Sequence, residues 1–335
     1  MNQNKKGILI RAAAICLAAA AVLAGLLLMT DFWEKSEYRE VRSTGTKEFM
    51  EEGQVIWEGA KYRKTPAVTT ILIAGIDKTE QSAGTGSSKY RNGGQADFLL
   101  LLAIDHTNKK IHRLQIDRDT MTDVTVLSVY GKETGTRVLQ ICLAHSYGAA
   151  KDDNAKYTVR AVKHLMNDIE ITGYYMVDYS AVPILNDTLG GVTVTVPDDM
   201  TSVNPQWQLG STVTLHGAEA ETFVRTRKTV GSGSNAERMR RQQEFTNRAI
   251  LAMNQRLAEN PEFSGTLLAA LKKNAVTNIP QEELLLEISE SHAYDIQPID
   301  YLEGEYRIAD NGFAEFHAEA DSVTAWIMTH LYTKE

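Results

Sequence analysis

The chain has 335 residues, of which 43% are hydrophobic, so it can form a sizeable core in one large domain or two smaller ones. Lys and Arg number 35 against 43 Asp and Glu, and the resulting net charge of -8 argues against general nucleic-acid binding, which depends on phosphate neutralisation. Only two cysteines occur, Cys16 and Cys142, which excludes a disulfide framework and a CxxC metal motif.

The N-terminus carries an apolar run at residues 7–29 that is interrupted only by Arg11 and is long enough to span a bilayer. Two lysines precede the run, whereas Asp31 and Glu34 follow it. The positive-inside rule therefore predicts a single-pass cell-membrane protein with residues 1–6 in the cytoplasm and the body outside. A cleaved signal peptide is the alternative, but the end of the run lacks a clear small-x-small cleavage site.

Two buried strands are expected near the start of the exported domain. Residues 30–65 are polar and charged, which indicates an extracytoplasmic stalk before a domain at residues 66–335. The apolar runs at 71–76 and 98–104 are typical of strands buried on both faces. The segment between them, residues 78–96, is rich in Gly and Ser and is expected to form a loop.

The rest of the domain alternates between strand and helix patterns, with glycine and proline at several ends. Strands interleaved with helices, in hairpins as well as crossovers, favour an α/β layer sandwich: a mixed β-sheet sandwiched by helices. In chain order we expect a strand at 111–116 leading into 117–120, helices at 138–148 and 155–166, a strand at 174–177, a helix at 181–189, a strand at 192–196, a helix at 217–228, a helix capped by Asn235 and running to about 260, and helices near 282–289 and 321–331.

A group of arginines is the first candidate site. Each of them alone has a structural alternative, because solvated arginines are common and cations are favoured near helix C-termini. Together they could instead grip phosphate oxygens through planar, bidentate contacts. The set consists of Arg118 at a strand end, Arg225 and Arg227 at a helix end, and Arg238, Arg241 and Gln242 on one face of the last long helix.

Two aspartates at strand ends, Asp77 and Asp97, are the second candidate site. They could converge on one hard cation such as Mg²⁺, although turn formation is the alternative that spacing alone leaves open. A carboxylate pair beside arginines is the composition that phosphoryl chemistry needs. His145 has apolar neighbours and is expected to be structural. The sequence contains no P-loop, GxSxG, HExxH or GxGxxG motif, so nucleotide and zinc mechanisms lose their usual support.

Five segments carry these residues in a characteristic order. They are ILIAGID (71–77), QADFLLLLAID (95–105) ahead of IDRDTMTDV (116–124), QICLAHSYG (140–148), ILNDTLGGVTVTVPDDM (184–200), and GAEAETFVRTRK (217–228) followed by NAERMRRQQ (235–243). In this order, behind an N-terminal anchor, they resemble the LytR-CpsA-Psr family of membrane-anchored enzymes of the bacterial envelope. The resemblance covers about residues 66–258, and the remainder is assigned to the same domain by continuity.

The resemblance implies transfer of a glycopolymer from a polyprenyl-pyrophosphate carrier to peptidoglycan, a phosphotransferase reaction assisted by Mg²⁺. It implies a fold with helices around a sheet and an apolar tunnel for the prenyl tail. Residues 138–143 and 161–166 could line the tunnel, although core packing is their favoured role. Matched residue by residue, it implies Asp77 and Asp97 for the metal, Arg118, Arg225, Arg227 and Arg238 for catalysis and pyrophosphate binding, and Arg241 and Gln242 for substrate binding. Asp119 matches an aspartate that could orient Arg118 or accept a proton, and both roles stay open.

This chain departs from the family pattern at three places. The usual Arg-Ser-Asp-Thr begins with Gln95 and ends with Phe98, a usual proline is Asp117, and a usual aspartate is Asn235. Because the other site residues are present, activity is the favoured interpretation. The alternatives are hydrolysis of the same lipid pyrophosphate and a non-catalytic envelope protein that binds it, whereas the acidic body disfavours a DNA-binding regulator.

Overall fold

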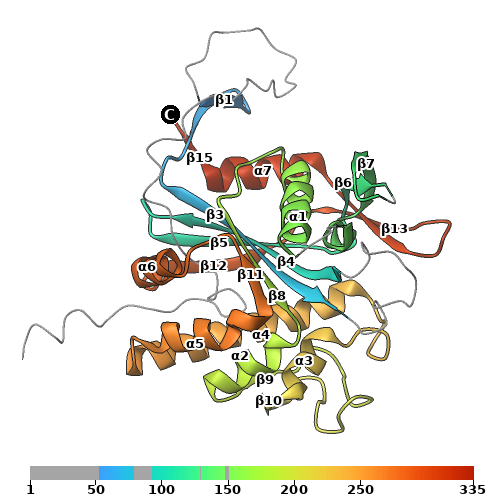
Figure 1. Cartoon of the computed structure of the whole chain (residues 1–335), viewed down its shortest axis with the longest axis vertical. Helices are drawn as coiled ribbons and strands as arrows, with labels where there is room; N and C mark the ends of the chain where they lie inside the picture. The colour runs from blue at the N-terminus through green and yellow to red at the C-terminus, as the bar shows by residue number, and fades with distance from the viewer. Residues whose placement is uncertain (1–52, 79–92, 129, 148–150) are drawn as a thin grey trace, which may run out of the picture.

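A six-stranded mixed sheet forms the centre of the protein (Figure 1). The computed structural model describes residues 53–78, 93–128, 130–147 and 151–335. The strand order is β11-β8-β3-β4-β5-β12, with parallel pairing of β3 to β8 and of β5 to β12 and antiparallel pairing elsewhere. The expected mixed α/β fold is therefore confirmed. The strands are β3 (Val68–Asp77), β4 (Gln95–Asp105), β5 (Lys110–Ile116), β8 (Gly173–Asp178), β11 (Ala275–Thr277) and β12 (Asp295–Asp300).

Helices cover both faces of this sheet, which explains why β3 and β4 are apolar at nearly every position. Figure 1 shows α1 and α7 on one side and α2, α3, α4 and α5 on the other. The two hydrophobic cores use alternate residues of the strands: Leu72 and Leu99 face α1 and α7, whereas Ile73 and Leu100 face α4. The helices are α1 (Lys151–Leu165), α2 (Ala181–Leu189), α3 (Ala218–Arg225), α4 (Asn235–Glu259), α5 (Phe263–Leu271), α6 (Gln281–Ser291) and α7 (Ala320–Leu331), with short 3₁₀ helices η3 (Ile141–Tyr147) and η4 (Lys272–Asn274).

Small sheets surround the centre. The predicted stalk contributes residues 54–64 to one of them, in which β2 pairs with both β1 and the C-terminal strand β15. The expected anchor at 7–29 lies outside the described residues. Within the described part of the chain, no helix is long and apolar enough to cross a membrane. The strands of these sheets are β1 (Gln54–Trp57), β2 (Ala60–Lys64), β15 (Tyr332–Lys334), β6 (Met121–Leu127), β7 (Glu133–Gln140), β9 (Val192–Thr195), β10 (Thr212–Leu215), β13 (Gly304–Ile308) and β14 (Ala314–Ala318).

Two sequence predictions need correction. The helix expected at 138–148 is instead the end of β7 followed by η3, because β7 pairs with β6 in a hairpin and Val138 is exposed there. The long helix α4 is capped by Ser234, whose hydroxyl accepts a hydrogen bond from the Glu237 amide at 3.3 Å, and not by Asn235. Asn235 is thereby free to face the interior, where it is 4% exposed.

A buried glutamate should make stability depend on pH. Glu287 in α6 is 4% exposed, and its Oε1 lies 3.6 Å from His106 Nε2 without forming a hydrogen bond. Burial, together with the nearby charge of Glu290, raises the pKa of Glu287 to about 7. Since the folded-state pKa exceeds the unfolded one, this carboxyl favours the fold at low pH and that contribution is lost as pH rises towards about 7.

Glu287→Gln should therefore be more stable than the wild type at about pH 8, by up to about 3 kcal/mol, and the difference should shrink towards about pH 4. Urea unfolding across this range measures it, with Glu282→Gln, an exposed position of the same helix that does not act on Glu287, as the matched control. An equal pH dependence of Glu287→Gln and wild type would show that the carboxyl is not the titrating group.

Candidate active site

Asp97 lies at a β-bulge between β3 and β4. The register shifts between Gly75 and Ile76, and Asp97 is left without a partner across the ladder. A bulge bends its strand and redirects a side chain, often next to an active site. Asp97 consequently accepts hydrogen bonds from two arginines, with Oδ1 bound by Arg118 Nη1 and Oδ2 bound by Arg238 Nη1 at 2.7 Å. Arg118 follows β5 and Arg238 lies in the first turns of α4, so three separate segments meet at this carboxylate.

Arg118 has further partners that hold its guanidinium plane. Nη2 donates to Gln95 Oε1 at 2.5 Å and to Cys142 Sγ at 3.0 Å. Gln95 stands where the family pattern has an arginine, so this departure supplies a neutral acceptor for Arg118. Burial raises the pKa of Cys142 to about 12, so its sulfur is a protonated thiol and not a nucleophile.

Asp77 and Arg225 form a second ion pair at the rim of the site. Arg225 is the last residue of α3, and its Nη2 and Nε donate to Asp77 Oδ1 and Oδ2 at 2.6 and 3.3 Å. Arg225 Nη1 also binds Glu221 at 3.0 Å. Burial lowers the pKa of Arg225, but the two carboxylates more than offset this and raise it. The Asp77 side chain is 21% exposed and Arg225 34%, so this pair can be reached by a ligand.

Asp119 lies among the guanidinium groups. Its Oδ1 accepts from Gln140 Nε2 at 3.1 Å and lies 3.4 Å from Arg118 Nε. Burial raises the pKa of Asp119, while Arg118 and, further off, Arg227 and Arg238 act to lower it. Arg227 is therefore within electrostatic reach of Asp119, although its Nε donates to the carbonyl oxygen of Gly233.

Buried polar atoms in this cluster lack hydrogen-bond partners. They are Arg118 Nε, Arg238 Nε and Asp119 Oδ2. Leaving a buried donor unpaired costs about 1–3 kcal/mol, and more for a charged group, so such atoms require an explanation. An anion bound between the guanidinium groups would pair both Nε donors. The cluster therefore has the composition that phosphate binding requires.

Arg241 does not join this cluster. It is fully buried, and its guanidinium binds Asp198 at 3.0 Å and the carbonyl oxygens of Phe223 and Thr226. Arg241 thus ties α4 to the end of α3, which supports the segment that carries Arg225 and Arg227. His145 is buried with Nδ1 3.0 Å from Thr158 Oγ1, and burial lowers its pKa to about 3, which fits the structural role expected for it.

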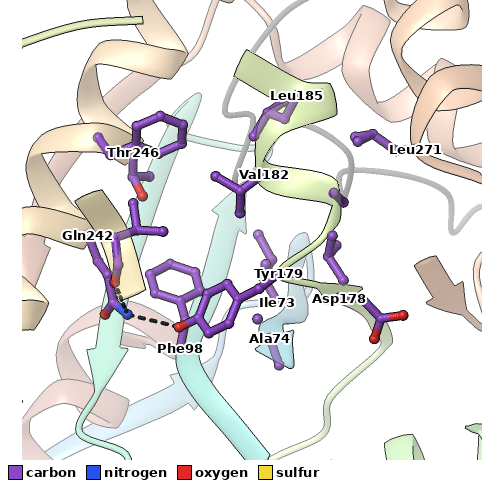
Figure 2. A pocket seen from close by; sticks show the side chains of 15 residues that line it. Ile73, Ala74, Phe98, Asp178, Tyr179, Val182, Leu185, Gln242, Thr246 and Leu271 are labelled. Atoms are coloured by element: carbon purple, nitrogen blue, oxygen red, sulfur yellow. Dashed lines mark hydrogen bonds between the residues drawn. The ribbon is translucent and has the colours of Figure 1, made fainter. Parts of the chain in front are cut away.

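An apolar pocket adjoins the charged cluster (Figure 2). It is partly open, with a volume of about 560 Å³ that includes open solvent, and it lies between the sheet and α2, α4 and α5. Phe98 and Val224, which line it, directly follow Asp97 and precede Arg225. At the junction Gln242 Nε2 donates to the hydroxyl of Tyr179 at 3.1 Å, as Figure 2 shows.

The core-packing role favoured for two apolar segments is confirmed. Residues 138–143 and 161–166 do not line the pocket, and Ile141, Ala161 and Met166 belong to the hydrophobic core on the other face of the sheet. Gln242 lines the pocket instead of joining the guanidinium groups. Tyr179 was not predicted, since a single tyrosine after a strand carries no signal of its own.

Asp77 and Asp97 are the two residues predicted to bind Mg²⁺. Across the described residues, no three His, Cys, Asp or Glu side chains gather closely enough to hold a metal ion. Mg²⁺, however, is usually bound through one or two carboxylates together with substrate phosphates. Asp77 and Asp97 have oxygen donors of this kind, and each carboxylate oxygen retains acceptor capacity beside its arginine. The pair therefore fits a cation that arrives with a phosphate ligand.

Known proteins are similar to this chain in sequence and in fold. Polyisoprenyl-teichoic acid--peptidoglycan teichoic acid transferase TagU from Bacillus cereus (strain AH820) is 27% identical over 231 residues. The alignment covers 68% of this chain and 65% of that relative, which is slightly less than two thirds of its length.

Solved structures share the fold. The crystal structure of B. subtilis TagV matches with a TM-score of 0.54 and 25% identity, covering 79% of this chain and 97% of TagV. A structure of TagT bound to LIIa-WTA matches with a TM-score of 0.57 and 20% identity, covering 80% of this chain and 92% of TagT. The LytR_cpsA_psr family itself matches residues 35–326. This span includes every strand of the central sheet and all four arginines of the cluster. The chain therefore belongs to the LytR_cpsA_psr family.

Proposed function

We propose that the protein transfers a glycopolymer from a polyprenyl-pyrophosphate carrier to peptidoglycan. The observation that carries the proposal is the contact between two environments: buried guanidinium groups with unpaired Nε donors lie beside an apolar pocket. A lipid-linked pyrophosphate likewise has a charged part, the pyrophosphate, joined directly to an apolar part, the prenyl chain. The arginines suit its phosphate oxygens and the pocket suits the first units of its prenyl chain.

The relatives support this assignment. TagU is named for transfer of polyisoprenyl-linked teichoic acid to peptidoglycan, and the TagT structure is bound to LIIa-WTA. The polymer that this chain carries is left unspecified by its own residues.

The reaction requires one bond to form and one to break. A sugar hydroxyl of peptidoglycan attacks the polymer-side phosphorus, the bond from this phosphorus to the bridging oxygen breaks, and polyprenyl phosphate leaves. Arg118, Arg225, Arg227 and Arg238 stabilise the charge that develops on the phosphoryl oxygens. We assign the hydroxyl proton to Asp119, because its Oδ2 has no partner among the described residues and burial raises its pKa.

Asp77 and Asp97 would hold Mg²⁺ in the loaded protein. When bound there, the ion neutralises charge on the phosphate oxygens and assists their transfer. The charge balance supports this: Arg118, Arg225, Arg227 and Arg238 lie among the carboxylates of Asp77, Asp97, Asp119 and Glu221, so the cluster has no surplus positive charge to offset a pyrophosphate. A divalent cation supplies that charge.

Product analysis tests the proposal. The full-length protein in liposomes, given a polyprenyl-pyrophosphate-linked glycopolymer and peptidoglycan, should produce polymer that is covalently attached to the wall and free polyprenyl phosphate. Release of soluble polymer phosphate with no attachment would instead show hydrolysis. Binding of the lipid without either product would show a binding protein, and both results would overturn the transferase assignment.

Filling the pocket should weaken lipid binding selectively. Val182 lines the pocket from α2, and Val182→Trp would occupy space that the prenyl chain needs. We expect the affinity for a polyprenyl pyrophosphate to fall by roughly tenfold or more, while the affinity for inorganic pyrophosphate changes little. Val159→Trp, a half-buried position in α1 on the other face, is the matched control. Equal losses in both variants would argue against the pocket as the lipid site.

Membrane attachment is part of the proposal. The apolar run at 7–29 and the charges around it support an anchor with the catalytic domain outside the cytoplasm. The anchor would keep the site near a substrate that stays in the bilayer, which raises its effective concentration. A reporter enzyme fused after Glu335 should be active only outside the cytoplasm, and activity inside would contradict this topology.

A further inference from the structure

Asp117 connects three parts of the structure through its carboxylate. It is 5% exposed, and its Oδ1 accepts hydrogen bonds from Asn235 Nδ2 at 2.7 Å and from the Asp119 backbone amide at 2.8 Å. Its Oδ2 accepts a hydrogen bond from the hydroxyl of Tyr306. A buried carboxylate is tolerated only when it is well hydrogen-bonded, and here both oxygens are bonded by neutral donors.

Asn235 links Asp117 to Arg238 through hydrogen bonds on both sides of its amide. Its amide nitrogen faces Asp117, so its amide oxygen must face the other way, where it accepts from Arg238 Nη2 at 2.5 Å. Arg238 Nη1 in turn binds Asp97. The order of donors and acceptors fixes the orientation of each group, from Tyr306 through Asp117 and Asn235 to Arg238.

Tyr306 comes from the β13–β14 hairpin, which lies far from the other site residues in sequence. The hairpin is held against the site by a hydrogen bond from the Phe316 amide to the Asp119 carbonyl oxygen at 2.8 Å. A second bond joins Gln140 Nε2 to the Ala314 carbonyl oxygen at 2.6 Å. The Tyr306 and Phe316 rings lie 4.9 Å apart, so the tyrosine is supported from within the hairpin.

We propose that Asp117, Asn235 and Tyr306 are positioning residues that hold Arg238 ready for the pyrophosphate. The role of Arg238 rests on the proposed function. When a ligand displaces Asp97 from Arg238, the bond to Asn235 still holds one edge of the guanidinium in place, so less rotamer freedom remains to be lost on binding. The two departures from the family pattern, Asp117 and Asn235, thereby act as one unit.

An exchange of the two side chains tests this unit. Asn235→Asp alone places two carboxylates in contact, and Asp117→Asn alone leaves a neutral acceptor that fixes the Asn235 amide less firmly than a carboxylate does. We expect each to weaken binding of a polyprenyl pyrophosphate by roughly tenfold. The double variant Asp117→Asn/Asn235→Asp restores an amide–carboxylate pair and should recover at least about threefold of the affinity that Asn235→Asp loses. Losses that multiply in the double variant would overturn the proposal.

Tyr306→Phe gives an independent measurement. It removes one hydroxyl at a half-exposed ring and should weaken lipid pyrophosphate binding by roughly threefold to tenfold. Tyr157→Phe is the matched control, because Tyr157 also donates to a carboxylate, Glu133, but outside the cluster of Arg118, Arg225, Arg227 and Arg238. Equal affinities of Tyr306→Phe and wild type would overturn the role of the tyrosine.

Wild type, the two single variants and the double variant should also be unfolded by urea in the absence of ligand. Non-additive stabilities would show that Asp117 and Asn235 are coupled, whatever the ligand is, and additive stabilities would overturn the coupling. A wild-type protein that binds no polyprenyl pyrophosphate would overturn the proposed function instead, so the two failures are distinguishable.

Discussion

Arg238→Lys should lower turnover of the lipid-linked glycopolymer by roughly 10- to 100-fold. The Arg238 side chain is 3% exposed. Its Nη1 donates to Asp97 and its Nη2 to Asn235, whereas its Nε has no hydrogen-bond partner. Lysine retains the charge but loses the planar fork, so it cannot keep the contacts to protein and phosphate together. Each lost charge-assisted hydrogen bond is worth about 1.5–3 kcal/mol, which sets the size of the effect. Initial rates at saturating and limiting substrate measure it.

Arg240→Lys is the matched control on the same helix. Its side chain is 52% exposed and binds Asp198 at 2.6 Å, outside the arginine cluster. Turnover of this variant should stay within about twofold of wild type, because exposed ion pairs contribute little. If both lysine variants behaved alike, Arg238 would have no special part in phosphate binding.

Asp97→Asn should reduce turnover by on the order of a hundredfold or more. Asp97 is 6% exposed, and its carboxylate pairs with Arg118 and Arg238. Removing one partner of a buried ion pair leaves the other charge uncompensated, at a cost of about 3–5 kcal/mol. The amide is also a poorer Mg²⁺ ligand, so we expect the remaining activity to need more Mg²⁺ for saturation. Turnover across a Mg²⁺ titration measures the loss of activity and the Mg²⁺ requirement, and urea unfolding measures the stability cost.

Asp198→Asn separates ion pairing from metal binding. Asp198 is 8% exposed and, like Asp97, pairs with two arginines, Arg240 and Arg241, but away from the cluster. It should lower stability to unfolding while leaving the Mg²⁺ requirement of turnover unchanged. An Asp97→Asn protein with the wild-type Mg²⁺ requirement would remove Asp97 from the proposed metal site.

Four strands of the central sheet, β3, β4, β5 and β8, and most helices could be predicted from local pattern, whereas β11 and β12 were not predicted. The apolar runs of β3 and β4 and the periodicity of α1, α2 and α7 depend only on neighbouring residues, and these elements are confirmed. The segment at 138–148 could not, because its apolar start belongs to β7, whose pairing with β6 is a tertiary interaction. An exposed hairpin strand has no buried face, so it lacks the alternation that would reveal it.

The sequence predicted which residue types form the site, but not which partner each side chain contacts. Arg238 and Arg241 lie one turn apart on α4 and share a face in sequence, yet one reaches Asp97 and the other reaches the end of α3. Spacing along a helix gives a direction but not what lies opposite. Tyr306 lies 189 residues from Asp117, and no signal in the sequence marks that contact.

The paired state of the arginines has a consequence for selectivity. Arg118 and Arg238 already hold Asp97, and Arg225 holds Asp77, so an incoming anion competes with internal carboxylates for the same donors. Chloride or a single phosphate offers too few contacts to replace two ion pairs at once, whereas a pyrophosphate spans several guanidinium groups. In the proposed function, the protein's own aspartates would therefore compete with small anions for the arginines.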